Sequence, residues 1–189
     1  MNHILSFDGT ESLIRRAPFA ERIRCAQNLS ERFAAIDGYY RAAWPAVKLA
    51  PCHRWAIDPY EVDWCALFSP IEDAVWFEIR AEGIVLYPQH PIAGFFVDFG
   101  HPVARVAVEC DGRKFHSDRA KDDERQHAIE SRGWKVYRLT SSECRWQRPQ
   151  DEDPETGAPV FVPSFARKVL REIAATHGLS AFHRGAEAT

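Results

Sequence analysis

The sequence predicts an α/β protein whose mixed central sheet is flanked by helices. A capped helical segment at 69–83 is followed by three short apolar runs, a polar helical segment and a fourth apolar run. Short turns join the first three runs, which is typical of antiparallel strands. A helical crossover joins the third run to the fourth, and such strands pair in parallel with a right-handed connection. The predicted order across 69–140 is therefore helix, strand, strand, strand, helix, strand.

The first helix of this order has clear boundaries in the sequence. Ser69 is a good N-cap, Pro70 suits the first helical position, and Gly83 ends the segment. Its apolar residues recur at helical spacing, so one face is expected to be buried.

Three other segments also have helical patterns. Apolar spacing predicts one or two helices across 18–44, a polar helix over 118–132 and an amphipathic helix over 164–178. The acidic, Pro-rich stretch 149–159 is predicted to be an exposed loop.

The four expected strands are short and rich in apolar residues. They are IVLYPQH at 84–90, GFFVDF at 94–99, RVAVECDG at 105–112 and WKVYRLT at 134–140. A Gly-His-Pro turn is expected between the second and the third strand.

Length and composition suit one soluble domain with attachments. The chain has 189 residues, of which 46% are hydrophobic and 27% are charged. We predict an N-terminal helical extension at 1–68, a core at 69–148, and an acidic loop with a C-terminal helix packed on the core at 149–189. No run approaches the ~18 apolar residues of a membrane span, and no secretory signal is recognised. Five scattered cysteines without a CxxC pair favour reduced thiols and a cytoplasmic location.

The net charge of −3 does not by itself favour a nucleic-acid partner, but its distribution does so modestly. Residues 1–104 hold 9 Lys+Arg and 13 Asp+Glu, whereas residues 105–148 hold 11 and 8. Basic charge is thus concentrated around the third strand. A solvated face would explain the pattern about as well.

Three carboxylates stand at the ends of two apolar strands. Asp98 lies at the end of its strand, and Glu109 and Asp111 end the next. Residues two apart on a strand share a face about 6.6 Å apart. Like charges that lie close together in a partly buried site oppose folding unless a cation compensates them. Hard carboxylate oxygens suit Mg²⁺ or Mn²⁺, so we predict a metal site held by Asp98 and Glu109.

Two further candidates have alternative roles. Glu72 completes an S-x-x-E capping box with Ser69, which could be its whole role, or it could point at the carboxylates. His116 follows Asp111 by five residues and could orient or deprotonate a water, or could simply be exposed. The basic residues around it would contact phosphates or form a solvated face, and they are Arg113, Lys114, Arg119, Lys121 and Arg125.

These motifs resemble those of a known group of domains. The stretches SPIEDAVWFEIRAEG, YPQHPIAGFFVDFG, RVAVECDGRKFH and KDDERQHAIESRGWKVYRLTSSE are similar to PD-(D/E)XK-fold domains related to the very-short-patch mismatch repair endonuclease. The resemblance covers residues 69–145. It implies a restriction-endonuclease-like core and an Mg²⁺-dependent DNA endonuclease.

The resemblance also implies roles for individual residues. Asp98 matches the motif aspartate, Glu109 the motif acidic residue, and Glu72 the acidic residue of the first core helix. Asp111 stands where the wider superfamily has its lysine, and His116 matches a histidine that takes part in the chemistry of the repair relatives.

Departures from the family pattern bear on catalysis and specificity. Without the usual lysine, water must be activated by the metal, by His116 or by a displaced base such as Lys114. Asp122 and Arg125 match an acidic-basic pair of the following helix. The zinc-binding cysteines of the repair enzyme are not reproduced, so mismatch specificity is not expected.

Three functions remain open from the sequence. The leading one is a nuclease that acts on DNA, in which a homodimer would supply two sites for double-strand cutting. The second is a catalytically inactive nuclease-fold module that binds nucleic acid. The third is a partner-binding protein whose function lies in residues 1–68 and the C-terminal helix.

Overall fold

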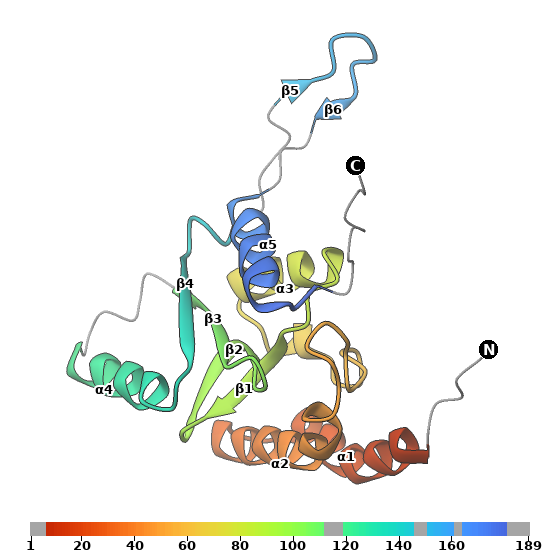
Figure 1. Cartoon of the computed structure of the whole chain (residues 1–189), viewed down its shortest axis with the longest axis vertical. Coiled ribbons are helices and arrows are strands. Elements are labelled where there is room, and N and C mark those ends of the chain that lie inside the picture. The colour runs from red at the N-terminus through yellow and green to blue at the C-terminus, as the bar shows by residue number, and fades with distance from the viewer. Residues whose placement is uncertain (1–6, 112–118, 146–150, 161–163, 181–189) are drawn as a thin grey trace.

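The computed structural model describes residues 7–111, 119–145, 151–160 and 164–180 (Figure 1). In chain order the elements are α1 (Phe7–Cys25), α2 (Leu29–Val47), the 3-10 turn η1 (Trp64–Ala66), α3 (Pro70–Ala81), β1 (Tyr87–Ile92), β2 (Phe95–His101), β3 (Val106–Asp111), α4 (Arg119–Glu130), β4 (Lys135–Thr140), β5 (Asp151–Glu152), β6 (Pro159–Val160) and α5 (Phe165–His177). The predicted fold class and the order from α3 to β4 are confirmed.

The main sheet has four strands in the order β1-β2-β3-β4. Strands β1 and β2 are antiparallel, as are β2 and β3, whereas β3 and β4 are parallel. The helix α4 makes the crossover between the parallel pair, as the sequence predicted. The sheet is therefore mixed, with β1 and β4 as its edges.

Helix α3 begins and packs as its sequence predicts. Ser69 accepts a hydrogen bond from the backbone N–H of Glu72, the Glu72 side chain accepts from the backbone N–H of Ser69, and Pro70 occupies the first turn. Val75 and Ile79, on the apolar face of the helix, are fully buried. The capping box and this apolar face together fix where the start of α3 lies against the sheet.

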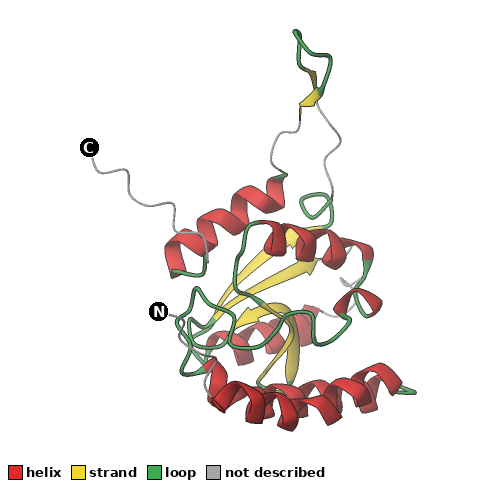
Figure 2. Cartoon of the chain, turned by 90° about the vertical axis from the view of Figure 1, so that its right-hand side faces the viewer, coloured by secondary structure: helices red, strands yellow, loops and turns green. Residues whose placement is uncertain are grey.

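Helices cover both sides of the sheet. Figure 1 shows α3 and α5 together on one side, the α1–α2 pair on the other, and α4 beside β4. Figure 2 shows the same layers from a perpendicular direction, with the sheet between the long helices and the α3–α5 pair. Ile36 of α2, Val75 of α3 and Leu170 of α5 belong to one buried apolar cluster. A smaller cluster around Ile129 attaches α4 to the sheet.

The strand boundaries differ from the prediction most at both ends of β1 and at the end of β2. The first strand begins at Tyr87, because the segment before it pairs elsewhere: Ile84 bridges Ser180, and the Val85 N–H donates to the Leu179 carbonyl. Strand β2 continues to His101, so the turn before β3 comes later than the expected Gly-His-Pro. Apolar pattern does not reveal which neighbour a strand pairs with.

The segment predicted to be an exposed loop at 149–159 contains a short hairpin. Strands β5 and β6 pair antiparallel, and the connecting turn is held by Asp153, whose Oδ1 accepts from the N–H groups of Glu155 and Thr156. Figure 1 shows this hairpin projecting away from the sheet. Residues 154–158 are exposed and lie outside the strands, as predicted, but the two short strands that flank them were not predicted. A local side-chain-to-backbone turn organises the segment.

Helix α5 packs on α3 through buried Ala166, Leu170 and Ile173. In the part of the chain that is described, no helix is long and apolar enough to cross a membrane. The predicted domain boundaries at 68/69 and 148/149 stay predictions.

Candidate active site

A row of polar residues crosses the sheet at one level. Glu109 pairs with Arg138 of β4 in the ladder. Strand β2 pairs Phe99 with Val108, so one residue further along Asp98 stands opposite Glu109. In β1, the pairs on either side place Gln89 opposite Asp98. Neighbouring strands lie about 4.8 Å apart, so side chains of this row are within reach of one another.

Asp98 lies partly buried in this row. Its Oδ2 accepts a hydrogen bond from the backbone N–H of Cys110 at 2.6 Å, which inserts the carboxylate into the end of the β2–β3 ladder. Burial, then the charges of Glu109 and Glu72, raise the pKa of Asp98 well above its ordinary value. Asp98 is thus a carboxylate whose negative charge is costly in the folded protein.

Glu109 is 6% exposed and is paired with a cation from α4. Arg125 Nη2 lies 2.6 Å from Glu109 Oε1 and also donates to the Phe96 carbonyl at 2.8 Å. Burial raises the pKa of Glu109, although the Arg125 guanidinium acts in the opposite direction. Arg125 was expected to contact nucleic acid, and the structure gives it this carboxylate as its partner.

Glu72 reaches the same place from the start of α3. Its Oε2 accepts from the Ser69 N–H at 2.6 Å, and its Oε1 accepts from Gln89 Nε2 at 2.8 Å. Its carboxylate also lies close enough to Asp98 for its charge to help raise the pKa of Asp98. The two roles left open for Glu72 are therefore combined, since the capping carboxylate also contacts Asp98.

Asp111 lies further out, where β3 ends. Arg138 Nη1 approaches its two oxygens at 3.3 and 3.4 Å, and both side chains are 39% exposed. Asp111 lies near enough to Glu109 for its charge to help raise the pKa of Glu109. The structure therefore brings together Glu72, Asp98 and Glu109, with Asp111 at the solvent edge.

Several predicted site residues fall on parts of the chain whose placement is not described. Arg113, Lys114 and His116 lie outside the described residues. Arg119 and Lys121 belong to α4, but their side chains are also outside the description. Their predicted contacts stay predictions.

Sequence reasoning missed Gln89 and Arg138. Each is linked to a site carboxylate, Gln89 to Glu72 and Arg138 to Asp111. Their positions in the row depend on strand register. The register could be predicted from the sequence only if the ends of each strand were known with single-residue accuracy.

The donor set suits a hard divalent cation. Glu72, Asp98 and Glu109 offer carboxylate oxygens, which Mg²⁺ and Mn²⁺ prefer. In the described residues no three potential ligands stand in a ready-made metal cluster. Protein donors hold these carboxylates instead: Arg125 for Glu109, the Cys110 N–H for Asp98, and Gln89 for Glu72. Burial is the largest cause of the raised pKa values of Asp98 and Glu109, and a bound cation would stabilise their ionised forms there.

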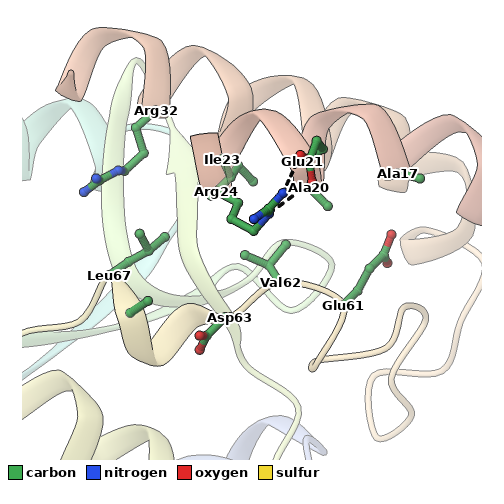
Figure 3. Close-up of a pocket in the computed structure, with 11 residues that line it drawn as sticks. Ala17, Ala20, Glu21, Ile23, Arg24, Arg32, Glu61, Val62, Asp63 and Leu67 are labelled. Carbon is green, nitrogen blue, oxygen red and sulfur yellow. Dashed lines mark hydrogen bonds and ion pairs between the residues drawn. The ribbon is translucent and has the colours of Figure 1, made fainter. Parts of the chain in front are cut away.

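A separate cavity of about 500 Å³ lies between α1, the start of α2 and the segment 61–67. Figure 3 shows Arg24 of α1 paired there with Glu21 of the same helix. The lining residues include none of the predicted site residues. Two buried polar atoms beside it, Glu61 Oε1 and Arg32 Nε, are enclosed by protein and cannot meet a molecule in the cavity without rearrangement.

One protein-family model matches the part of the chain that holds the site carboxylates. The family model REase_MTES_1575, a restriction-endonuclease-like domain, matches residues 71–154. This segment runs from α3 through β4 and contains Glu72, Asp98 and Glu109. The match supports the coarser part of the resemblance, whereas the relation to the very-short-patch endonuclease stays a prediction.

Two individual proteins are similar to parts of the chain. The uncharacterized protein YcjD of Escherichia coli (strain K12) is 40% identical over 55 residues, which are 29% of this chain and 47% of that protein. The chain thus spans about half the length of the curated relative it matches. The homing endonuclease I-Bth0305I catalytic domain aligns over 58% of this chain and 98% of its own, with 20% identity and a TM-score of 0.39.

Proposed function

We propose that this chain is a metal-dependent DNA endonuclease that hydrolyses phosphodiester bonds. The observation that carries the proposal is the gathering of Glu72 with Asp98 and Glu109, which stand opposite each other on β2 and β3, with the pKa values of Asp98 and Glu109 raised. The match of the restriction-endonuclease-like family model to this segment supports the same reading.

The proposed roles follow from position. Asp98 and Glu109 would hold Mg²⁺ or Mn²⁺, Glu72 would assist through its contact with Asp98, and Asp111 would act from the solvent edge. When bound, the ion would supply a positive charge for the phosphate and would acidify a water. His116 remains the proposed group that orients or deprotonates that water, and DNA the proposed substrate.

For Glu109 to bind a cation, Arg125 would have to give up its ion pair with Glu109. Arg125 lies on Glu109 and neutralises it. Arg125 is 23% exposed, so its guanidinium would reach solvent or a phosphate by giving up its contacts with Glu109 and the Phe96 carbonyl when a cation takes its place. This exchange would combine the expected phosphate contact of Arg125 with the ion pair seen in the structure.

The second candidate is a nuclease-fold module that binds nucleic acid without cutting it. It is favoured by Asp111, which stands where related nucleases have a lysine, and by Arg125, which occupies Glu109. Such a module would bind DNA with a strong salt dependence. Its binding would not require Asp98 to be ionisable.

The deciding experiment is nicking of supercoiled plasmid with Mg²⁺, Mn²⁺ or EDTA. Asp98→Asn and Glu109→Gln keep side-chain shape and remove the charge. We expect metal-dependent nicking by the wild type and a decrease of at least about 100-fold in each variant, because even substitutions that only support metal ligands cost about 10–100-fold. Glu155→Gln, an exposed carboxylate of the β5–β6 hairpin, is the matched control and should nick normally.

The binding module is tested in the same preparation. Calorimetric titration with Mn²⁺ and a DNA mobility assay at two salt concentrations separate the two candidates. Salt-sensitive DNA binding that Asp98→Asn leaves unchanged, with no metal-dependent nicking, would replace the endonuclease by the binding module. Equal trace nicking by the wild type and both variants would have the same meaning.

A further inference from the structure

Gln89 has an unusual backbone for a residue inside a strand. Its φ is +46°, in the left-handed region that favours glycine. Ala93 and Arg105, the other non-glycine residues described with positive φ, lie in the turns between strands, where such angles are common. Gln89 lies within β1, where strand geometry demands a negative φ. A backbone of this kind persists only where surrounding contacts maintain it, and it is frequent at functional sites.

The side chain of Gln89 is directed at the candidate active site. Its Nε2 donates to Oε1 of Glu72 at 2.8 Å, which joins the edge strand β1 to the start of α3. The other oxygen of Glu72 accepts from the Ser69 N–H. The Glu72 carboxylate is therefore held from two directions, by its own helix and by the sheet.

The place of Gln89 in the sheet explains what this contact does. Gln89 stands opposite Asp98, between the paired residues Pro88↔Phe99 and His90↔Val97. The Glu72 carboxylate lies close enough to Asp98 for its negative charge to help raise the pKa of Asp98. Two carboxyl groups at such short range repel each other when both are ionised. This repulsion would move the two carboxyl groups apart. A neutral donor that reaches Glu72 from beside Asp98 opposes that movement.

We propose that Gln89 is a positioning residue that holds Glu72 against Asp98, and that its left-handed backbone is maintained for this contact. The inference rests on the proposed function for its purpose, since it makes Glu72 the third carboxylate of the metal site. The contact itself is a property of the metal-free protein and can be tested without activity.

Two substitutions distinguish the effect of the left-handed backbone at Gln89 from the effect of its side-chain contact with Glu72. Gln89→Asn retains a residue that tolerates the left-handed region, but its amide is one methylene shorter and does not reach Glu72. Gln89→Gly removes the side chain and suits the positive φ. Both variants are therefore expected to fold with a thermal midpoint equal to or above that of the wild type. Ala93→Gly is the matched control, because it eases a positive φ of +57° in the adjacent turn without touching Glu72.

The first measurement is a pair of metal-free crystal structures, of the wild type and of Gln89→Asn. We expect the Glu72 carboxylate to leave Asp98 in the variant while the Ser69 capping contact remains. The second is calorimetric titration with Mn²⁺, where affinity should fall about 10-fold in both Gln89 variants, in the range known for residues that orient metal ligands. In plasmid nicking kcat should fall while KM for DNA stays unchanged, and Ala93→Gly should match the wild type throughout.

The outcomes distinguish this inference from the proposed function. A wild type that binds Mn²⁺ but does not nick refutes the nuclease, while the affinities of the Gln89 variants still test the positioning role. If the wild type binds no Mn²⁺, the two metal-free structures decide. Glu72 still resting on Asp98 in Gln89→Asn would overturn the inference, as would loss of stability in both Gln89 variants with unchanged Mn²⁺ affinity.

Discussion

Two glutamates with largely buried side chains, each paired with an arginine, lie in different layers of this protein and have different surroundings. Glu61, in the segment between α2 and α3, is paired with Arg16 of α1 at 2.9 Å, and their side chains are 10% and 5% exposed. Glu109 of β3 is paired with Arg125 of α4 at 2.6 Å, and the side chains of Glu109 and Arg125 are 8% and 23% exposed. By distance and burial alone the two pairs are similar.

The surroundings of the two pairs differ. Glu61 accepts hydrogen bonds from the Arg16 guanidinium and from the neutral Tyr39 hydroxyl. Glu109 stands with Asp98 and Glu72, and these two are held by neutral donors, the Cys110 N–H and the Gln89 amide. A balanced pair suits a structural role, whereas an excess of carboxylates opposes folding unless a cation joins them. The two glutamates thus differ less in burial than in the number of carboxylates around them, and this difference is the basis for expecting a cation at Glu109 rather than at Glu61.

The largest effect is expected at the balanced pair. Arg16→Met leaves Glu61 buried without its guanidinium, and breaking a buried pair costs about 3–5 kcal/mol of the free energy of unfolding. Urea denaturation measures the loss. Mg²⁺ should not restore stability, and nicking per folded molecule should equal that of the wild type. Recovery of stability with Mg²⁺ would show that this pair is not purely structural.

A smaller loss with a different response to metal is expected at the candidate site. Arg125→Met removes the guanidinium from Glu109, but its side chain is more exposed than that of Arg16, so we expect about 2–3 kcal/mol. Because the remaining carboxylates then lack their cation, millimolar Mg²⁺ should recover most of the loss. Denaturation of both Met variants with Mg²⁺ and with EDTA makes the comparison direct. Equal insensitivity of the two variants to Mg²⁺ would contradict a metal site at Glu109.

Much of the fold could be predicted because it depends on local signals. Ser69, Pro70 and the apolar face of α3 are contiguous in the sequence, and the crossover through α4 required β3 and β4 to be parallel. The errors came where pairing between distant segments decides. The strand predicted from Ile84 begins later because Ile84 bridges Ser180, almost a hundred residues away along the chain.

The carboxylates of the candidate site could be predicted from the sequence, but the residues that contact them could not. Asp98 and Glu109 stand out because acidic residues interrupt apolar strands. Glu72 was visible as a cap, but its contact with Asp98 depends on how α3 packs on the sheet. Gln89 gave no signal, because no local pattern predicts a left-handed glutamine within a strand.

The smallest effect, and the one with opposite signs in the two regions, comes from neutralising a single carboxylate. Burial, followed by the charges of Glu109 and Glu72, raises the pKa of Asp98, so the folded protein binds this proton more tightly than the unfolded chain, where Asp titrates near about 4. Stability of the metal-free protein should therefore fall as pH rises from about 4 through the folded-state pKa.

Asp98→Asn removes this decline, because an amide does not ionise and its oxygen can still accept from the Cys110 N–H. The variant should be more stable than the wild type at neutral pH in EDTA, and each tenfold difference in proton affinity is worth about 1.4 kcal/mol. Glu61→Gln should be less stable than the wild type, because it removes the negative charge that pairs with the Arg16 guanidinium. Thermal melts of both variants across pH 4–8 compare the two regions in one experiment. A decrease in stability in both variants would mean that the charge of Asp98 is compensated within the protein, and that no cation is needed at the candidate site.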